Sequence, residues 1–382
     1  MDTEQKLNIL ADSSKFDLAC ACKYSHEPPR LRGPQGRWIY PAVLPSGRKV
    51  FLLKTLQSNA CVNDCSYCPF NSNRDLTRCS LEPDQLARTF MQLVQAQRVS
   101  GLFLSSGVSS NPDATMAQMI ATVEILRNRC RFRGYIHLKV IPGAAPAAIE
   151  QAVRLATRVS VNIEAPNEQR LGILSKRKRF HQDIIASMDQ IRRCRDEIDP
   201  KCSQTTQFVV GAAQESDREI VLATDRLYKR FDMERVYFSA YQDIDAPPAT
   251  TDSADMLFPD LAVDPASTYS ENFIREHRLY QVDFLLRKYK FSFEEICFDA
   301  DNNLSLQSDP KLIWANHHPE FFPVDPNRAD YEQLLRVPGI GPVGARRIVK
   351  ARSQQRIRRL DDLKTLAIRA NIAAKYLILP AN

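Results

Sequence analysis

The feature that most constrains the fold of this 382-residue chain is an alternation of strand-like and helix-like segments between residues 48 and 289. Short apolar runs typical of strands alternate with segments whose apolar residues repeat at helical spacing. Strands are expected at 48–56, 101–105, 135–141, 158–164, 205–211 and 235–241, and helices near 82–98, 113–129, 146–156, 181–195, 216–231 and 271–289. Six such pairs predict an α/β fold, a partial (β/α)6 TIM-like barrel with parallel strands.

The character of the sequence changes after residue 298. Residues 299–326 contain several prolines and no clear period, so we expect a linker over residues 299–322. Beyond it, short helical patterns flank residues 337–341 and a third lies near 360–366, which predicts a small all-α domain. The predicted organisation is an N-terminal extension (1–47), the barrel (48–298), the linker (299–322) and a C-terminal domain (323–382).

Composition excludes some classes of protein. No apolar run is long enough to span a bilayer, and the polar first residues lack the regions of a signal peptide, so we expect a cytoplasmic location and no membrane association. Ten cysteines are then expected to be reduced thiols or metal ligands. The net charge of +7 suits a polyanionic partner without requiring one.

The decisive chemical motif is a Cys-x3-Cys-x2-Cys run formed by Cys61, Cys65 and Cys68 on the loop after the first strand. Three thiolates from one short loop can bind three irons of a cubane cluster and leave the fourth iron open to a chelating substrate. The alternatives are a structural zinc site with Cys79 as fourth ligand, or a group of buried thiols. An auxiliary cluster is not expected, and Cys20 and Cys22 are the closest remaining pair.

This run, with the aromatic Tyr67 just before the last cysteine, resembles the radical S-adenosylmethionine (SAM) superfamily, whose members place it after the first strand of a partial barrel. The resemblance implies an enzyme with a [4Fe–4S] cluster on Cys61, Cys65 and Cys68, and with SAM chelating the free iron. Reductive cleavage of SAM would generate a 5′-deoxyadenosyl radical that abstracts hydrogen. It also implies an electron donor such as a flavodoxin or a ferredoxin.

The resemblance also suggests residues that bind SAM at the carboxyl ends of the strands. Ser105, Ser106 and Gly107 end the second strand, where family members hold the methionyl amino group, although the usual glutamate is absent here. Asn162 and Glu164 end the fourth strand and would contact the ribose or the amino group. Val209, Val210, Gly211 and Tyr241 end the last two strands and would contact adenine. Glu164 as a buried ion-pair partner and Tyr241 as barrel packing are the alternatives, and the sequence identifies no residue that quenches a radical.

A second motif, residues 335–342 (LRVPGIGP), resembles a helix-hairpin-helix DNA-binding motif. Gly339 and Gly341 permit a tight hairpin, and Pro342 suits the first turn of a helix whose N-terminus can face a phosphate. The candidate nucleic-acid contacts are Val337, Gly339, Ile340, Gly341, Gly344, Arg346, Arg347 and Lys350. The alternative is a structural hairpin that packs on the barrel or binds a protein. The basic run 175–181 (SKRKRFH) favours a solvated loop over a nucleic-acid channel.

Nearly the whole chain resembles a family of radical SAM proteins assigned to DNA modification or repair. The segments KLNILADSSKFD, SNACVNDCSYCPFNS, GLFLSSGV, VNIEAPN, QFVVGAAQESDREI, VYFSAY and LLRVPGIGP carry this resemblance. It implies DNA as a partner and an association with a uracil-DNA glycosylase-like protein. Two other hypotheses stay open: a radical SAM enzyme acting on tRNA, a peptide or a small molecule with the hairpin used for assembly, and a non-enzymatic metal-dependent DNA-binding protein.

Overall fold

The computed structural model describes residues 1–13, 39–43, 49–242, 265–366 and 368–379. Cys20 and Cys22 lie outside these residues. Contacts divide the chain into two compact units, Met1–Glu215 with Arg226–Asn272, and Ser216–Asp225 with Phe273–Asn382. The sequence-based boundaries at 298 and 322 stay predictions. Within the described part, no helix is long and apolar enough to cross a membrane.

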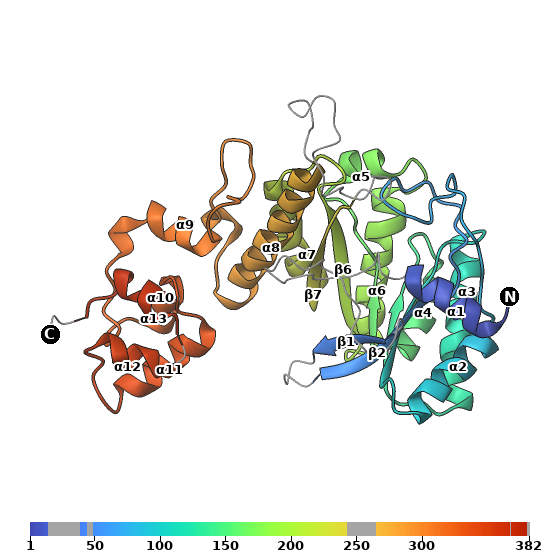
Figure 1. The fold of residues 1–382 in the computed structure, drawn as a ribbon, viewed down its shortest axis with the longest axis horizontal. Coiled ribbons are helices and arrows are strands. Elements are labelled where there is room, and N and C mark those ends of the chain that lie inside the picture. The colour runs from blue at the N-terminus through green and yellow to red at the C-terminus, as the bar shows by residue number, and fades with distance from the viewer. Residues whose placement is uncertain (14–38, 44–48, 243–264, 367, 380–382) are drawn as a thin grey trace, which may run out of the picture. The chain divides into compact units, whose positions relative to one another are not determined.

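The first unit is built on one sheet whose seven strands follow one another in chain order (Figure 1). The strands are β1 (Ile39–Val43), β2 (Lys49–Leu56), β3 (Gly101–Ser105), β4 (Tyr135–Lys139), β5 (Arg158–Ser160), β6 (Ser203–Val210) and β7 (Arg235–Ala240). From β2 to β7 every neighbouring pair is parallel. These six strands form a curled half-barrel, which confirms the predicted fold class. The sequence did not predict β1, which pairs antiparallel with β2.

Helices alternate with the parallel strands as expected. They are α1 (Thr3–Ser13), α2 (Pro83–Gln95), α3 (Pro112–Glu124), α4 (Pro146–Leu155), α5 (Glu168–Leu174), α6 (Ala186–Glu197), α7 (Asp217–Phe231) and α8 (Pro265–Lys288). The sequence did not predict α1, which precedes the sheet, or α5. Single turns of π-helix extend α3 over Ile125–Arg129 and precede α6 over Phe180–Ile185. Asn111 and Asn167 cap α3 and α5, because each side chain accepts a hydrogen bond from a first-turn N–H group.

The two faces of the parallel strands differ in chemistry. Because side chains alternate along a strand, Leu102, Leu104 and their equivalents on other strands are fully buried among apolar side chains. The intervening residues form a partly polar row: Lys54 lies opposite Phe103, and Phe103 opposite His137. Lys54 Nζ lies 4.8 Å from the Phe103 ring centroid, and His137 Nε2 lies 2.8 Å from Ser160 Oγ. The strands therefore have one apolar face and one with polar side chains.

The second unit holds the C-terminal helices α9 (Pro310–His317), α10 (Tyr331–Arg336), α11 (Pro342–Arg352), α12 (Leu360–Lys364) and α13 (Ala370–Ala373). α10 to α13 bury one apolar core, to which Leu334, Ile340, Ile348 and Leu363 contribute. α9 lies in the segment predicted as a linker. Its Trp314 packs edge-on against Phe291 and Phe321, both at 5.5 Å between ring centroids.

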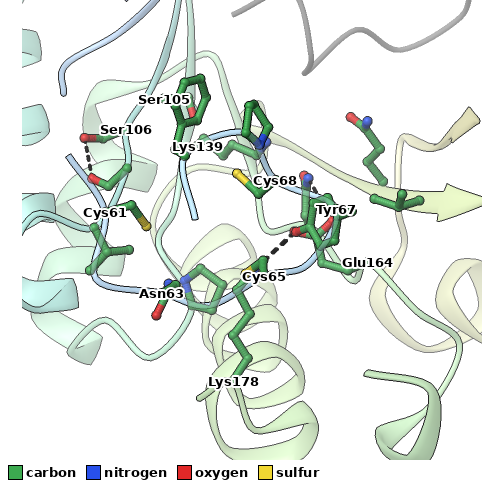
Figure 2. A pocket seen from close by; sticks show the side chains of 18 of the residues that line it. Cys61, Asn63, Cys65, Tyr67, Cys68, Ser105, Ser106, Lys139, Glu164 and Lys178 are labelled. Atoms are coloured by element: carbon green, nitrogen blue, oxygen red, sulfur yellow. Dashed lines mark hydrogen bonds and ion pairs between the residues drawn. The ribbon is translucent and has the colours of Figure 1, made fainter. Parts of the chain in front are cut away.

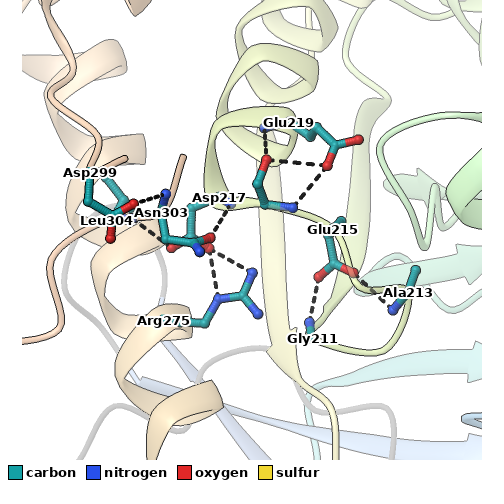
Figure 3. Close-up of polar contacts among 10 residues, drawn as sticks. Gly211, Ala213, Glu215, Asp217, Glu219, Arg275, Asp299, Asn303 and Leu304 are labelled. Carbon is teal, nitrogen blue, oxygen red and sulfur yellow. Dashed lines mark hydrogen bonds and ion pairs between the residues drawn. The ribbon is translucent and has the colours of Figure 1, made fainter. Parts of the chain in front are cut away.

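A buried carboxylate, Asp217, joins distant segments within the second unit (Figure 3). Arg275 Nε donates to Asp217 Oδ1 at 3.0 Å, and the Leu304 N–H donates to Oδ2 at 3.0 Å. Ser216 and Glu219 begin the same helix with a reciprocal cap, in which each side chain accepts from the other's N–H group. Burial raises the pKa of Asp217, and the Arg275 guanidinium partly offsets this.

We expect Arg275→Met to lower the free energy of unfolding by about 3 kcal/mol, because it leaves a buried carboxylate without its cation. Arg230→Met is the matched control: its partner Asp189 is 35% exposed and Arg230 itself 58% exposed. Loss of that surface pair is expected to cost less than about 1 kcal/mol. Urea unfolding followed by circular dichroism measures both, and equal effects would contradict a structural role for the Asp217 pair.

Candidate active site

The loop between β2 and α2 carries Cys61, Cys65 and Cys68, and it is fixed by its own hydrogen bonds. The Cys68 N–H donates to the Cys65 carbonyl at 3.0 Å, and the Asn71 side-chain amide donates to the same carbonyl at 3.2 Å. The Arg78 guanidinium donates to the carbonyls of Asn59 and Phe70 at 2.7 and 2.9 Å. Irregular backbone needs such partners when it is partly buried, so these bonds hold the loop in one conformation.

All three cysteines line one pocket, shown in Figure 2. Burial raises the pKa of the Cys65 thiol, and burial together with the nearby Cys65 raises the pKa of Cys68 to about 12. Cys61 also raises the pKa of both, so the three thiols are close enough to influence one another. Cys79 does not line this pocket, and its thiol instead lies 3.9 Å from the carbonyl oxygen of Lys6.

The pocket lies at the carboxyl ends of the parallel strands, where barrel enzymes assemble active sites. Ser105 ends β3, Lys139 ends β4, and Ser239 and Ala240 end β7. Gln207 and Val209 are two residues apart on β6, so both side chains lie on the pocket side of the sheet. The polar face of the strands thus becomes the wall of the pocket.

Glu164, Lys178 and Tyr67 form a buried polar group beside the cysteines. Lys178 Nζ lies 3.4 Å from Glu164 Oε1 and 3.4 Å from the Tyr67 hydroxyl oxygen. The side chains of Lys178 and Glu164 are only 11% and 6% exposed. Burial raises the pKa of Tyr67 well above its usual value. Burial alone would lower the pKa of Lys178, but Cys65 and Glu164 raise it, so the ammonium stays charged.

Residues 174–178, which we name the strap, hold the cysteine loop from a distant part of the sequence. The Ser66 N–H donates to the Leu174 carbonyl at 2.8 Å. Asp64 accepts from Ser175 Oγ at 2.5 Å and from the Lys176 N–H at 3.0 Å. The Arg177 guanidinium donates to the Val62 carbonyl. The interpretation of this basic run as a solvated loop is wrong for Ser175 and Lys178, because Ser175 is buried against Asp64 and Lys178 lines the pocket.

Most of the residues suggested for SAM binding line the pocket: Tyr67, Ser105, Ser106, Gly107, Asn162, Glu164 and Tyr241. Gly107 lies so close to the cysteine loop that a Cβ there would be 2.5 Å from the Ala60 carbonyl oxygen. At the end of the fifth predicted strand, Val209 lines the pocket, whereas Val210 and Gly211 do not. Val210 is fully buried, and the Gly211 N–H donates to Glu215 at 2.5 Å (Figure 3).

The sequence reasoning missed several lining residues, including Lys139, Gln207, Ser239 and Lys178. The first three lie at or near strand ends, so the two-residue period of the strands could have identified them. Lys178 offers no such signal, because its partners Tyr67 and Glu164 lie on other segments and only the folded chain brings them together.

The hairpin between α10 and α11 has the geometry expected of a tight turn at one glycine but not at the other. Gly339 has φ +86°, which favours glycine, and a Cβ there would be 2.8 Å from the Arg369 carbonyl oxygen. Gly341 has φ −104° and needs no left-handed backbone, so the expectation that both glycines shape the turn is wrong for Gly341. A side chain at position 341 is limited instead by the Tyr289 hydroxyl oxygen, which would lie 3.1 Å from a Cβ atom there.

The candidate nucleic-acid residues separate into two groups. Val337, Ile340 and Gly344 are buried in the core of the helical domain, so they shape it. Arg346, Arg347 and Lys350 are exposed along α11. α11 begins with Pro342, and no side chain caps its N-terminus. A helix start of this kind can place backbone N–H groups against an anion.

A buried lysine of α9 supports the hairpin within the second unit. Lys311 Nζ donates to the Ile340 carbonyl at 2.6 Å and lies 4.6 Å from the Tyr289 ring centroid. Burial lowers the pKa of Lys311 to about 7. α9 is therefore part of the structure that holds the hairpin.

Two protein-family models match parts of this chain. Residues 56–227 match the model of the radical SAM superfamily, and residues 321–367 match that of the helix-hairpin-helix motif. The chain carries a radical SAM domain. The cofactors of the radical SAM superfamily are a [4Fe–4S] cluster and SAM.

Two solved structures align with part of the chain at low identity. The HydG maturase of [FeFe]-hydrogenase from Carboxydothermus hydrogenoformans is 16% identical over 60% of this chain and 51% of its own, with a TM-score of 0.44. Methylornithine synthase PylB is 16% identical over 50% and 54%, with a TM-score of 0.41. The chain thus aligns with about half the length of these structures. No curated protein matches it.

The pocket of the radical SAM domain fits a cluster better than a single ion. Among the residues the structure describes, no three His, Cys, Asp or Glu side chains are placed to hold one metal ion. Cys79 lies outside the pocket that the other three cysteines line, so it is not placed as a fourth ligand beside them. A cubane cluster is larger and takes one thiolate at each of three irons, which suits three cysteines around one pocket.

We expect Cys65→Ala to abolish assembly of the [4Fe–4S] cluster and Cys79→Ala to leave it unchanged. Cys65 lines the pocket, and Cys79 does not. Iron and sulfide content after anaerobic reconstitution, with the visible absorbance of the cluster, measures this. Loss of iron in Cys79→Ala would show that this cysteine is a ligand and contradict the assignment.

We also expect the free energy of unfolding to rise between about pH 7 and pH 10 because of Lys311. Its pKa is about 7 in the folded chain, whereas an unfolded lysine titrates near about pH 10. In this window the unfolded chain binds more protons, so stability rises with pH. Lys311→Met should lose this slope and Lys350→Met, at an exposed lysine, should keep it. Urea unfolding at pH 7 and pH 9 measures the slope, and identical slopes in both variants would contradict the role of Lys311.

Proposed function

We propose that this radical SAM enzyme modifies or repairs DNA, with Cys61, Cys65 and Cys68 as the cluster ligands and residues 323–382 as the DNA-binding domain. When bound, the cluster and SAM supply a 5′-deoxyadenosyl radical that abstracts hydrogen. The boundaries of the barrel (48–298) and the linker (299–322) belong to this proposal, and the cytoplasmic location remains a prediction from sequence.

The observation that carries the proposal is where the positive charge lies. The last 46 residues contain ten Lys and Arg, two Asp and no Glu, a net charge of +8 against +7 for the whole chain. The preceding 336 residues are therefore almost neutral. Charge concentrated on one small domain is the electrostatic signature of a nucleic-acid-binding module. A hairpin used only to pack the helices together would not need it.

The residues of this domain favour contact with phosphates over bases. Arg346 and Lys350 are exposed on the helix that follows the hairpin. Backbone N–H groups at a helix start and flexible cations both bind phosphate oxygens, which are the same at every sequence position. Binding is therefore expected to be weakly sequence-specific and strongly dependent on salt.

The pocket of the radical SAM domain supports action on a nucleotide outside the base stack. The reactive position lies inside a pocket lined by the ends of the strands, which a base within a duplex cannot enter. Tyr67, Phe70 and Tyr241 offer aromatic faces in this pocket, and Ser105, Asn162 and Gln207 offer hydrogen-bonding groups. Such a lining can hold a flipped base and exclude water.

Two protein partners belong to the proposal by resemblance to the DNA modification or repair family. One is an electron donor such as a flavodoxin or a ferredoxin, which the reduction of the cluster requires. The other is a uracil-DNA glycosylase-like protein, which would produce or consume a damaged site in the same DNA.

The test measures 5′-deoxyadenosine after anaerobic reconstitution with iron and sulfide, using dithionite and SAM with and without duplex or single-stranded DNA. We expect DNA to stimulate cleavage of SAM. We expect Arg346→Gln with Lys350→Gln to weaken DNA binding and to reduce the slope of log affinity against log salt by about two.

The matched control is Arg88→Gln with Arg98→Gln, which removes the same charge from exposed positions of the radical SAM domain. It should leave DNA binding unchanged. Cleavage that is indifferent to DNA, while tRNA or a peptide stimulates it, would replace the proposal with the alternative substrate class. Equal loss of binding in both double variants would show that net charge alone, and not the helical domain, binds the DNA.

A further inference from the structure

Lys178 presents a fixed positive charge at the cysteine loop. Its ammonium lies 3.4 Å from the Tyr67 hydroxyl oxygen and 5.9 Å from the centroid of the Tyr67 ring. Lys178 and Cys65 line the same pocket, in which Tyr67 lies two residues after Cys65 along the cysteine loop. Figure 2 shows the Lys178 side chain reaching up to Cys65 from the strap.

The strap prevents this lysine from moving away. Asp64, the residue before Cys65, accepts hydrogen bonds from both Ser175 and the Lys176 backbone, and the Ser66 N–H donates to Leu174. The residues on both sides of Cys65 are thus bonded to the segment that carries Lys178. With its side chain 11% exposed, the ammonium is screened little by water.

We propose that Lys178 is a positioning residue that raises the reduction potential of the [4Fe–4S] cluster. The inference rests on the proposed cluster ligands Cys61, Cys65 and Cys68. One-electron reduction adds a negative charge to the cluster, and a fixed positive charge nearby stabilises the reduced form. Hydrogen bonds to the sulfurs and local net charge are the means by which a protein sets such potentials.

Glu164 opposes Lys178, so the two charges must be separated experimentally. Lys178 Nζ lies 3.4 Å from Glu164 Oε1, so each charge partly cancels the effect of the other on the cluster. Removing Lys178 alone would also leave the buried Glu164 carboxylate without its cation, which is a second change beside the lost charge. The comparison is therefore made with Gln at position 164.

The experiment is a redox titration of the anaerobically reconstituted full chain without SAM, with dithionite as reductant and the reduced cluster followed by electron paramagnetic resonance. Glu164→Gln should shift the midpoint potential upward from wild type. Adding Lys178→Met to Glu164→Gln should shift it downward, since these two proteins differ only in the lysine charge. Equal potentials in these two variants would overturn the proposal.

Two controls separate charge from structure. Lys176→Met removes an exposed ammonium from the same strap and should leave the potential unchanged. Lys178→Arg keeps the charge and should stay close to wild type, whereas a shift as large as that of Lys178→Met would point to packing and overturn the role of the charge. If the double variant takes up no cluster, Lys178→Gln in the Glu164→Gln background makes the same comparison, and a potential equal to that of Glu164→Gln refutes the inference.

Failure of the proposed ligands gives a different result. Wild type that assembles no cluster, or Cys65→Ala that assembles a normal one, would overturn the ligand assignment and the inference with it. Normal assembly in wild type, its loss in Cys65→Ala and identical potentials in Glu164→Gln with and without Lys178→Met would overturn the inference alone. Because each readout is made without SAM or DNA, neither depends on the substrate.

Discussion

The structure depends on the two-residue period of its parallel strands. One set of side chains is apolar and buried, which stabilises the half-barrel. The other set carries Lys54, His137 and Gln207, polar groups that need partners or a ligand. These two requirements leave polar side chains at the carboxyl ends of the strands, and the cysteine loop closes over the same place. The pocket is thus a direct consequence of strand geometry.

Much of the barrel could be predicted, because each strand and helix has its own local pattern. The limits of that reasoning are visible at Glu164. The sequence predicts a strand over 158–164, but β5 ends at Ser160, and Glu164 has a left-handed backbone with φ +64°. It still pairs with β6, since its N–H donates to Gln207 at 3.0 Å and its carbonyl accepts from Val209 at 2.9 Å. No local pattern indicates such an interruption.

Site residues that form a motif of fixed spacing in the sequence could be predicted, whereas residues that meet only through contacts between distant segments could not. The three cysteines form a motif within eight residues, so the sequence alone predicts them. Lys178 meets Tyr67 across 111 positions of the chain, and its basic neighbours favour a solvated loop. α9 was missed for a similar reason: Lys311 and Trp314 are ordered by contacts with the hairpin and with aromatic side chains elsewhere in the unit.

The separation of charge along the chain has a kinetic consequence. A nearly neutral N-terminal part exerts little long-range force on a polyanion, whereas the C-terminal 46 residues attract it across about a Debye length, roughly 8 Å at physiological salt. Under the proposed function, DNA would first bind residues 337–382, which we call the tail, and would enter the pocket afterwards. The tail would set how often an encounter occurs, and the pocket would decide which encounters lead to reaction.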